Sequence, residues 1–226
     1  EAITDSDTAI LKLNKELAEI NKKLSNVSEK LSKSRKAAGE RLETAIEKEL
    51  SELDMPKVRF IVSIEDTEDF TKNGKNVVEF LISPNPGEPE KKLERIASGG
   101  ELSRIMLAVK SILADADDVD TLIFDEIDTG VSGSAARKIS LKLSKLAAKK
   151  QIICVSHQAQ PAAFADNHFY VEKKETENRT VTSVKLLDNE ERIKEIARIT
   201  DGEELSEASV LHAKQMLAKA EEEKNA

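Results

Sequence analysis

Apolar residues divide the chain into a long helical segment and a mixed segment. Residues 1–54 carry isoleucine or leucine every seven positions, with a second apolar set offset by three. The first set is Ile3, Ile10, Leu17, Leu24 and Leu31, and the second is Leu13, Ile20 and Val27. This is the spacing of the two seam positions of a coiled coil. We predict one long coiled-coil helix whose seam pairs with a second copy or with a segment that this chain does not contain.

The apolar seam changes phase before the helix ends. It weakens around residues 34–41 and then resumes at Leu42, Ile46, Leu50 and Leu53. Such a shift is expected where a helical rod meets a globular head. An amphipathic helix lying on its own domain is the alternative, but a helix of this length rarely finds a long enough surface. Because Pro56 ends the helix, we predict a coiled-coil arm, residues 1–54, and a head portion, residues 55–226.

Beyond Pro56 the pattern alternates between strands and helices. Strands are predicted at residues 58–64, 77–82, 121–124, 151–155, 169–171 and 181–187, and helices from Ser98 onward and at 135–148, 190–199 and 204–220. The runs at 121–124 and 151–155 are continuously apolar and are joined by a helix. We therefore predict a parallel pair of strands buried on both faces. The predicted fold class is α/β, with a mixed, partly parallel sheet and flanking helices.

The helix predicted from Ser98 onward has a start suited to binding an anion. Ser98 and Glu101 stand at the spacing of a capping box, and an apolar run at helical spacing follows. Gly99 and Gly100 lack the Cβ atom that would block a close-approaching anion. The first turn of a helix also offers free N–H groups and the positive end of a dipole. An ordinary capped helix explains the same four residues, so this motif is weak by itself.

Two of the predicted strands end in polar side chains. The apolar run at 121–124 leads into Asp125 and Glu126, and the next strand leads into His157. Ligands of parallel sheets bind beyond the carboxyl ends of the strands. Asp125 is the type of oxygen ligand that Mg²⁺ takes, usually through water, and Glu126 can polarise an attacking water. A solvated acidic turn is the alternative interpretation of a lone Asp-Glu pair.

Taken together, these segments resemble the motifs of ABC-type ATPases. Residues 98–101 resemble their signature motif, 121–126 their Walker B strand, 127–130 their D-loop and 155–157 their switch-histidine segment. The longer segments 97–108 and 124–133 resemble the RecN family of bacterial DNA repair proteins, which are relatives of the structural-maintenance-of-chromosomes (SMC) ATPases. The order and spacing of the motifs fit, and the resemblance extends from about residue 55 to residue 217. It implies the C-terminal lobe of an ABC-type ATPase head.

The resemblance also implies ATP and Mg²⁺ as cofactors and a role for each motif residue. Ser98, Gly99 and Gly100 would contact the γ-phosphate of ATP on a second head, and Glu101 is a cofactor-binding residue of the same motif. By the same resemblance Asp125 would hold Mg²⁺, Glu126 would act as the base, Asp128 would couple the heads at the nucleotide, and His157 would sense the γ-phosphate. Such a site forms only between two heads, so a homodimer is implied.

The sequence does not carry the P-loop that such a site requires. Its only Gly-Lys pair, Gly74-Lys75, has Asp69 where the first glycine should stand and Asn76 where the hydroxyl residue should stand. In the family that it resembles, this Walker A motif precedes the coiled coil. We therefore expect the chain to be a returning arm and C-terminal lobe that needs the N-terminal half for ATP hydrolysis and is inactive alone.

Composition limits the possible partners. The 226 residues are 39% hydrophobic and 35% charged, with a net charge of −8. This balance argues against bulk attraction to nucleic acid, so DNA, the partner that the resemblance implies, must be contacted locally. Residues 30–41 hold five basic side chains and one acidic one, a net charge of +4. They are a candidate contact for DNA phosphates, and the solvated face of a coiled coil is the alternative.

Three further observations bound the class of protein. The single cysteine, Cys154, falls inside a predicted strand, so we expect a packed residue and no disulfide. The sequence has no signal peptide and no apolar run near 18 residues, so we expect a cytoplasmic, nucleoid-associated protein. A purely structural coiled-coil dimerisation module remains an alternative. The nucleotide-binding domain of a transporter is disfavoured by the long heptad arm.

Overall fold

The computed structural model describes residues 2–96, 98–176, 179–202 and 204–225. The elements are α1 (Ala2–Glu52), β1 (Arg59–Thr71), β2 (Gly74–Ser83), β3 (Lys91–Lys92), the 3₁₀ helix η1 (Leu93–Arg95), α2 (Gly99–Leu113), β4 (Thr121–Asp125), α3 (Gly133–Ala147), β5 (Gln151–Val155), α4 (Ala159–Phe164), β6 (Phe169–Thr176), β7 (Arg179–Leu186), α5 (Asn189–Asp201) and α6 (Glu207–Lys224). They form two compact units: residues 1–47 with 58–94, and residues 48–57 with 95–226. The predicted division between arm and head at residue 54 stays a prediction.

Helix α1 confirms the predicted long helix, and its apolar seam is exposed. Leu17 is 56% exposed and Ile20 is 59% exposed, whereas Ile46 and Leu50 near the end of the helix are fully buried. The apolar side chains before the predicted change of phase are therefore largely exposed to solvent, and those near the end of the helix are buried. The side chain of Ile3 lies outside the described residues, and the pairing of the seam stays a prediction.

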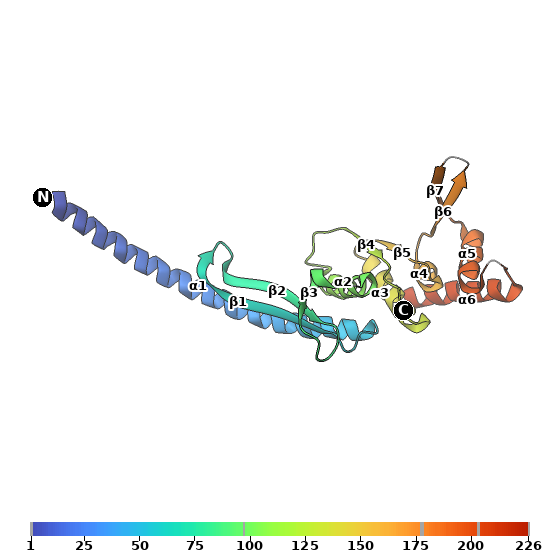
Figure 1. The fold of residues 1–226 in the computed structure, drawn as a ribbon, viewed down its shortest axis with the longest axis horizontal. Helices are drawn as coiled ribbons and strands as arrows, with labels where there is room; N and C mark the ends of the chain where they lie inside the picture. The colour runs from blue at the N-terminus through green and yellow to red at the C-terminus, as the bar shows by residue number, and fades with distance from the viewer. Residues whose placement is uncertain (1, 97, 177–178, 203, 226) are drawn as a thin grey trace. The chain divides into compact units, whose positions relative to one another are not determined.

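The β1–β2 hairpin runs along α1 within the first unit (Figure 1). Glu43 Oε1 accepts the N–H of Val62 at 2.7 Å, and Glu47 Oε1 accepts that of Phe60 at 3.2 Å. A Cβ atom added to Gly39 would lie 3.3 Å from the Val62 side chain, so the helix and the strand approach each other closely. Helix side chains thus satisfy backbone donors of β1, which would otherwise lack partners on this side.

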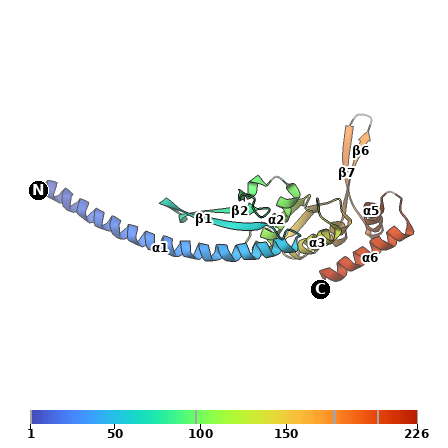
Figure 2. The ribbon, with the colours of Figure 1, turned by 60° about the horizontal axis from the view of Figure 1, so that its bottom comes forward.

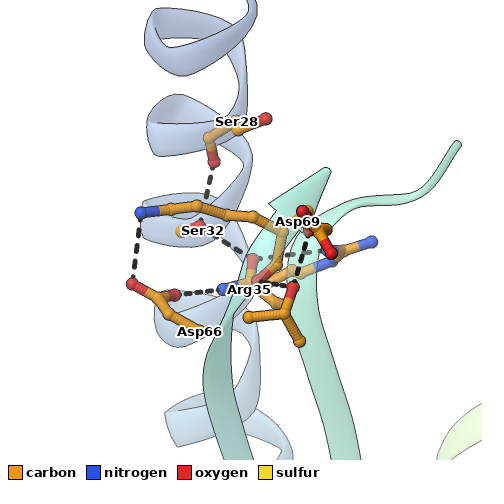
Figure 3. A network of polar contacts seen from close by, with 8 residues as sticks. Ser28, Ser32, Arg35, Asp66 and Asp69 are labelled. Atoms are coloured by element: carbon orange, nitrogen blue, oxygen red, sulfur yellow. Dashed lines mark hydrogen bonds and ion pairs between the residues drawn. The ribbon is translucent and has the colours of Figure 1, made fainter. Parts of the chain in front are cut away.

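A network of polar contacts joins the end of the hairpin nearest its turn to α1 (Figure 3). Ser32 Oγ donates to Asn76 Oδ1 at 2.7 Å, and Arg35 Nη1 donates to the same oxygen at 3.3 Å. Asn76 in turn donates to Asp66 at 2.6 Å, and Lys75 pairs with Asp66 at 3.2 Å. Connected bonds of this kind fix a geometry better than isolated ones do. The hairpin and this part of α1 therefore form one small structural unit.

In the second unit, β4 and β5 form the predicted parallel pair, with α3 between them in the chain. Asp125 at the end of β4 lies opposite Val155 at the end of β5. Helix α2 contacts β4, and α3 contacts both β5 and α2. Ile105 on α2 and Ile139 on α3 are at most 2% exposed, so these helices supply the core beside the strand pair.

The prediction that the strand pair is buried on both faces is wrong. Phe124 is 4% exposed, but its neighbour Ile123 is 68% exposed, and Ile153 and Val155 on β5 are 46% and 55% exposed. Successive side chains of a strand point to opposite faces. Helices α2 and α3 thus cover the face of Phe124 alone, which we call the covered face. The uncovered face consists of Ile123, Asp125, Ile153 and Val155.

The rest of the second unit is built from helices and a hairpin. Helices α4, α5 and α6 share a core of Ala163, Phe164, Ile196, Ala197, Ala213 and Ala220, and α5 packs against α6 (Figure 2). Gly202, with φ of +95°, ends α5 as predicted. Strands β6 and β7 form the predicted hairpin, and residues 177–178 of its turn lie outside the described residues. Among the helices described, none is both long and apolar enough to cross a membrane.

Candidate functional site

Helix α2 begins where the sequence predicts, with Ser98 as its N-cap. The hydroxyl of Ser98 accepts the N–H of Glu101 at 3.4 Å, and its carbonyl accepts the N–H of Leu102 at 3.0 Å. Ser98 and Gly99 are exposed to solvent. The first turn of a helix has N–H groups without intrahelical acceptors. An exposed, dipole-positive helix start is therefore present, as anion binding requires.

The two glycines of this start allow close contact with the segment that follows β4. A Cβ atom on Gly100 would lie only 2.9 Å from the backbone oxygen of Glu126 and 3.3 Å from that of Thr129. A Cβ atom on Gly99 would lie 3.2 Å from Oε2 of Glu126. Any other residue at position 100 would push the helix off this segment. Glycine at position 99 lets the Glu126 carboxylate lie beside the start of α2.

Glu126 itself has an unusual backbone conformation. Its φ of +55° lies in the left-handed region, which costs a non-glycine residue roughly 1–2 kcal/mol. Such strain persists where the surroundings fix it and is frequent at functional sites. Ser103 Oγ on α2 donates to the backbone oxygen of Asp125 at 2.8 Å, which fixes the end of the strand directly before the strained residue. Asp125 and Glu126 both present exposed side chains.

A buried arginine on α2 is hydrogen-bonded to the backbone of the segment that follows β4. Arg104 is 8% exposed, and its Nη1 donates to the backbone oxygens of Thr129 at 3.1 Å and Ile127 at 3.3 Å. Burial lowers the pKa of Arg104 from its usual value, while the negative charges of Glu101 and Asp54 oppose that change. Hydrogen bonds from a charged donor are stronger than neutral ones. Arg104 therefore fastens residues 127–129 to α2.

Asp128 points into its own chain. It is fully buried, and its Oδ2 accepts a hydrogen bond from the hydroxyl of Ser156. Its backbone oxygen accepts from Nε2 of Gln158 at 2.7 Å. Oδ1 of Asp128 is buried without a hydrogen-bond partner among the described residues. His157, between Ser156 and Gln158 in the chain, has an exposed side chain.

Cys154 on β5 is half-buried. Burial, followed by the negative charges of Asp128 and Asp125, raises the pKa of its thiol to about 12. A thiol with such a pKa stays protonated at neutral pH and is not a nucleophile. The prediction that Cys154 is a packing residue agrees with this, although the residue is not fully enclosed.

The structure thus brings three of the predicted motifs together around residues 126–129. The start of α2 and the end of β4 meet there directly, and the end of β5 is joined to them through Asp128. Within the described residues, no group of three His, Cys, Asp or Glu side chains is placed to hold a metal ion. The exposed carboxylate of Asp125 nevertheless fits Mg²⁺, which binds through one or two carboxylates, water and substrate phosphates.

Sequence reasoning missed four residues that build this arrangement. They are Ser103, Arg104, Ser156 and Gln158. Ser103 and Arg104 follow the 98–101 motif by two and three positions, Ser156 lies inside the 155–157 segment, and Gln158 follows it directly. Each is polar where an apolar helix or strand meets the site. Polar residues that flank a motif were therefore the signal that could have identified them.

Comparison with known proteins gives relatives of one kind. DNA repair protein RecN of Halalkalibacterium halodurans is 41% identical over 221 residues, which cover 96% of this chain and 39% of that protein. RecN of Bacillus subtilis is 38% identical over an alignment of 242 positions, gaps included, which covers 98% of this chain and 41% of that protein. The chain therefore spans about two fifths of the length of these relatives. No family model matches the chain.

A solved structure shows the fold. The crystal structure of the Smc head domain with a coiled coil and joint derived from Pyrococcus yayanosii aligns with a TM-score of 0.51. The alignment covers 72% of this chain and 29% of that chain, at 20% sequence identity. The aligned part of this chain has the fold of part of that Smc head domain.

Proposed function

Because this chain belongs to the RecN family of DNA repair proteins and has an SMC-type head fold, we propose that it supplies one half of an ATP-hydrolysing site. The observation that carries the proposal is the junction around residues 126–129. There the exposed start of α2, the segment from Asp125 at the end of β4 to Thr129, and the end of β5 are joined by direct contacts. Phosphoryl transfer needs mainly positioning and charge neutralisation, and a fixed arrangement of such groups suits that task.

Every predicted site residue except Asp128, which is fully buried, then has a task that fits its position. When bound, ATP would supply the phosphoryl group and Mg²⁺ would neutralise part of its negative charge. Ser98, Gly99 and Gly100 at the start of α2, of which Ser98 and Gly99 are exposed, would bind the γ-phosphate of a nucleotide held by a second head, and Glu101 belongs to the same motif. Asp125 would hold Mg²⁺, usually through water, Glu126 would take a proton from the attacking water, and His157 would contact the γ-phosphate.

The uncovered face supports the view that another segment completes this site. It carries Asp125 next to three exposed apolar side chains. Strands of parallel sheets are ordinarily buried on both faces, and the apolar runs of β4 and β5 have that pattern. We propose that the N-terminal half of a RecN polypeptide, which carries the Walker A motif, covers this face. A site completed in this way predicts no ATP turnover by this chain alone.

The proposed role of the whole protein is ATP-driven pairing of two heads during repair of DNA double-strand breaks by recombination, in the cytoplasm on nucleoid DNA. Segment 30–41 is the proposed DNA contact. Arg35 in that segment is half-buried and bonded to Asn76. The other four basic side chains of the segment, Lys30, Lys33, Lys36 and Arg41, are exposed. Exposed lysine and arginine can bind phosphates without regard to sequence.

Loss of the proposed base tests the function in a RecN-length protein, in which this chain is joined to the preceding part of a RecN polypeptide. Glu126→Gln should lower ATP turnover about 100-fold, the usual order for a missing general base. It should also leave ATP bound and the heads paired, because Asp125 and the helix start remain. Glu68→Gln, at an exposed glutamate on β1, is the matched control. Unchanged turnover in Glu126→Gln rules out the assignment.

The pairing of heads has its own test. Ser98→Arg should leave ATP binding to each head nearly intact but prevent ATP-driven pairing, because the added bulk blocks the helix start. Mixing this variant with Glu126→Gln should restore part of the activity, since a mixed pair keeps one site with both residues intact. If Ser98→Arg alone abolishes ATP binding, Ser98 acts on the nucleotide of its own head.

The exposed seam of α1 favours one alternative, a structural dimerisation module. Its apolar side chains, including Leu17 at 56% exposure, need a partner helix in water. Such a module would show no dependence on nucleotide even in the RecN-length protein. Association that is equal with and without ATP, together with no ATP turnover, would favour it.

A further inference from the structure

Both chain neighbours of His157 are tied to the same residue. The hydroxyl of Ser156 donates to the carboxylate of Asp128, and the side-chain amide of Gln158 donates to the backbone oxygen of Asp128 at 2.7 Å. The two neighbours are also joined to each other, because the backbone N–H of Gln158 donates to Ser156 Oγ at 3.0 Å. His157 is therefore the middle residue of a three-residue segment, 156–158, whose two outer residues are both hydrogen-bonded to Asp128. We call this segment the arch.

Asp128, to which residues 156 and 158 are bonded, is itself fixed by its surroundings. Asp128 has no exposed surface. The residue that follows it, Thr129, accepts a hydrogen bond from buried Arg104 and lies against Gly100 of α2. A buried carboxylate with few partners is costly to expose or to leave unpaired, so the bond from Ser156 is hard to give up. The position of the arch is thus set from the start of α2.

We infer that Ser156 and Gln158 are positioning residues, which hold His157 through Asp128 at a fixed place relative to Glu126 and the start of α2. Asp128 then acts inside its own chain, as the point where the end of β5 is joined to the segment after β4. The inference rests on the proposed function for its effect on turnover. The arch itself is tested without nucleotide.

Hydrogen exchange tests the arch directly in this chain. Ser156→Ala removes the acceptor of the Gln158 N–H, so that amide should exchange roughly fivefold faster, as expected for one lost hydrogen bond. Ser156→Thr keeps a hydroxyl and should restore slow exchange. Ser183→Ala, at an exposed serine on β7, is the matched control and should leave Gln158 unchanged. Equal exchange in Ser156→Ala and the unsubstituted chain overturns the inference.

Turnover by the RecN-length protein tests positioning. Ser156→Ala and Gln158→Met should each lower kcat for ATP about tenfold with KM unchanged, because a displaced His157 affects the reaction more than nucleotide binding. Ser156→Thr should recover most of kcat. A purely structural role would lower the amount of folded protein without this split and would give Ser156→Thr no advantage over alanine.

The two readouts separate the inference from the function on which it rests. Faster exchange at Gln158 together with unchanged kcat in Ser156→Ala overturns the positioning role, although the arch exists. If the unsubstituted RecN-length protein hydrolyses no ATP, the proposed function fails, and the arch is then judged on exchange alone.

Discussion

The two faces of the β4–β5 pair have the same kind of sequence but different surroundings. On the covered face Phe124 is 4% exposed, and α2 and α3 lie beside the strands. On the uncovered face Ile123 is 68% exposed and Val155 is 55% exposed. Both faces carry apolar side chains, although the uncovered face also carries Thr121, Asp125 and Gln151 at the strand ends. The apolar positions are suited to burial on both faces. The difference indicates that this chain supplies the cover of one face only.

The proposed chemistry follows this difference. Asp125 belongs to the uncovered face, and Glu126 follows it in a strained conformation. The contacts that hold this end of the sheet, from Ser103 and Arg104, come from α2. The covered side therefore fixes the geometry of the site, and the uncovered side carries Asp125, one of the groups proposed to react.

Replacing a large side chain by alanine should lower the free energy of unfolding far more on the covered face than on the uncovered face. Phe124→Ala leaves a cavity against α2 and should lower the free energy of unfolding by about 3–5 kcal/mol. Ile123→Ala removes a side chain that is already 68% exposed and should change it by less than about 1 kcal/mol. Urea unfolding of this chain measures both.

The cost of Ile123→Ala should differ between this chain and the RecN-length protein, in which the uncovered face is proposed to be buried. In the RecN-length protein Ile123→Ala should cost about 2–4 kcal/mol, the usual cost for a buried isoleucine. A cost of less than 1 kcal/mol in both proteins would mean that nothing covers this face.

Two glycines at helix starts should respond in opposite ways. Gly100→Ala places a Cβ atom 2.9 Å from the Glu126 backbone oxygen and should destabilise the second unit by about 1–3 kcal/mol. Gly133→Ala, at the start of α3, meets no atom within 4 Å and should be neutral or slightly stabilising, because alanine favours helix. Equal unfolding midpoints for the two variants would show that α2 does not press against the segment after β4.

The single cysteine gives a smaller effect that depends on pH. Cys154 lies on the covered face, where burial raises the pKa of its thiol from 9.0 to about 12. The unfolded chain therefore releases this proton first as the pH rises, and stability falls above pH 9. The loss should be about 1 kcal/mol between pH 9 and pH 10.

The control for this effect is Cys154→Ala, in which that part of the pH dependence disappears. A cysteine placed on the uncovered face instead, as Ile153→Cys in the Cys154→Ala background, should ionise near its ordinary pKa and add no such dependence. Identical curves of stability against pH for all three proteins would contradict the different surroundings of the two faces.

Sequence reasoning identified the elements well because periodicity and caps are local signals. The long helix α1, the N-cap Ser98 and the stop at Gly202 were all found at their residues. Burial on both faces was predicted from the apolar run through Ile123, and there the reasoning failed. A strand sequence records that a face is to be covered, but it does not record which polypeptide segment covers it.

The candidate site also has parts that the sequence predicts and parts that depend on tertiary packing. The motif residues Asp125 and Glu126 were found at the end of β4, as the strand pattern indicates. The inward position of Asp128 and its bond from Ser156 were not found, because they depend on how two loops far apart in the sequence pack. The strain at Glu126 likewise has no sequence signal, since nothing in its neighbours requires a left-handed backbone.

The central claim is that another part of a RecN polypeptide covers the uncovered face and completes the site there. A single-cysteine probe tests it most directly: Ile123→Cys in the Cys154→Ala background, reacted with a small alkylating reagent. In this chain alone the probe should react as fast as a thiol in an exposed peptide. In the RecN-length protein it should react at least about tenfold more slowly, whether or not ATP is bound. Equally fast reaction in both proteins would contradict the claim.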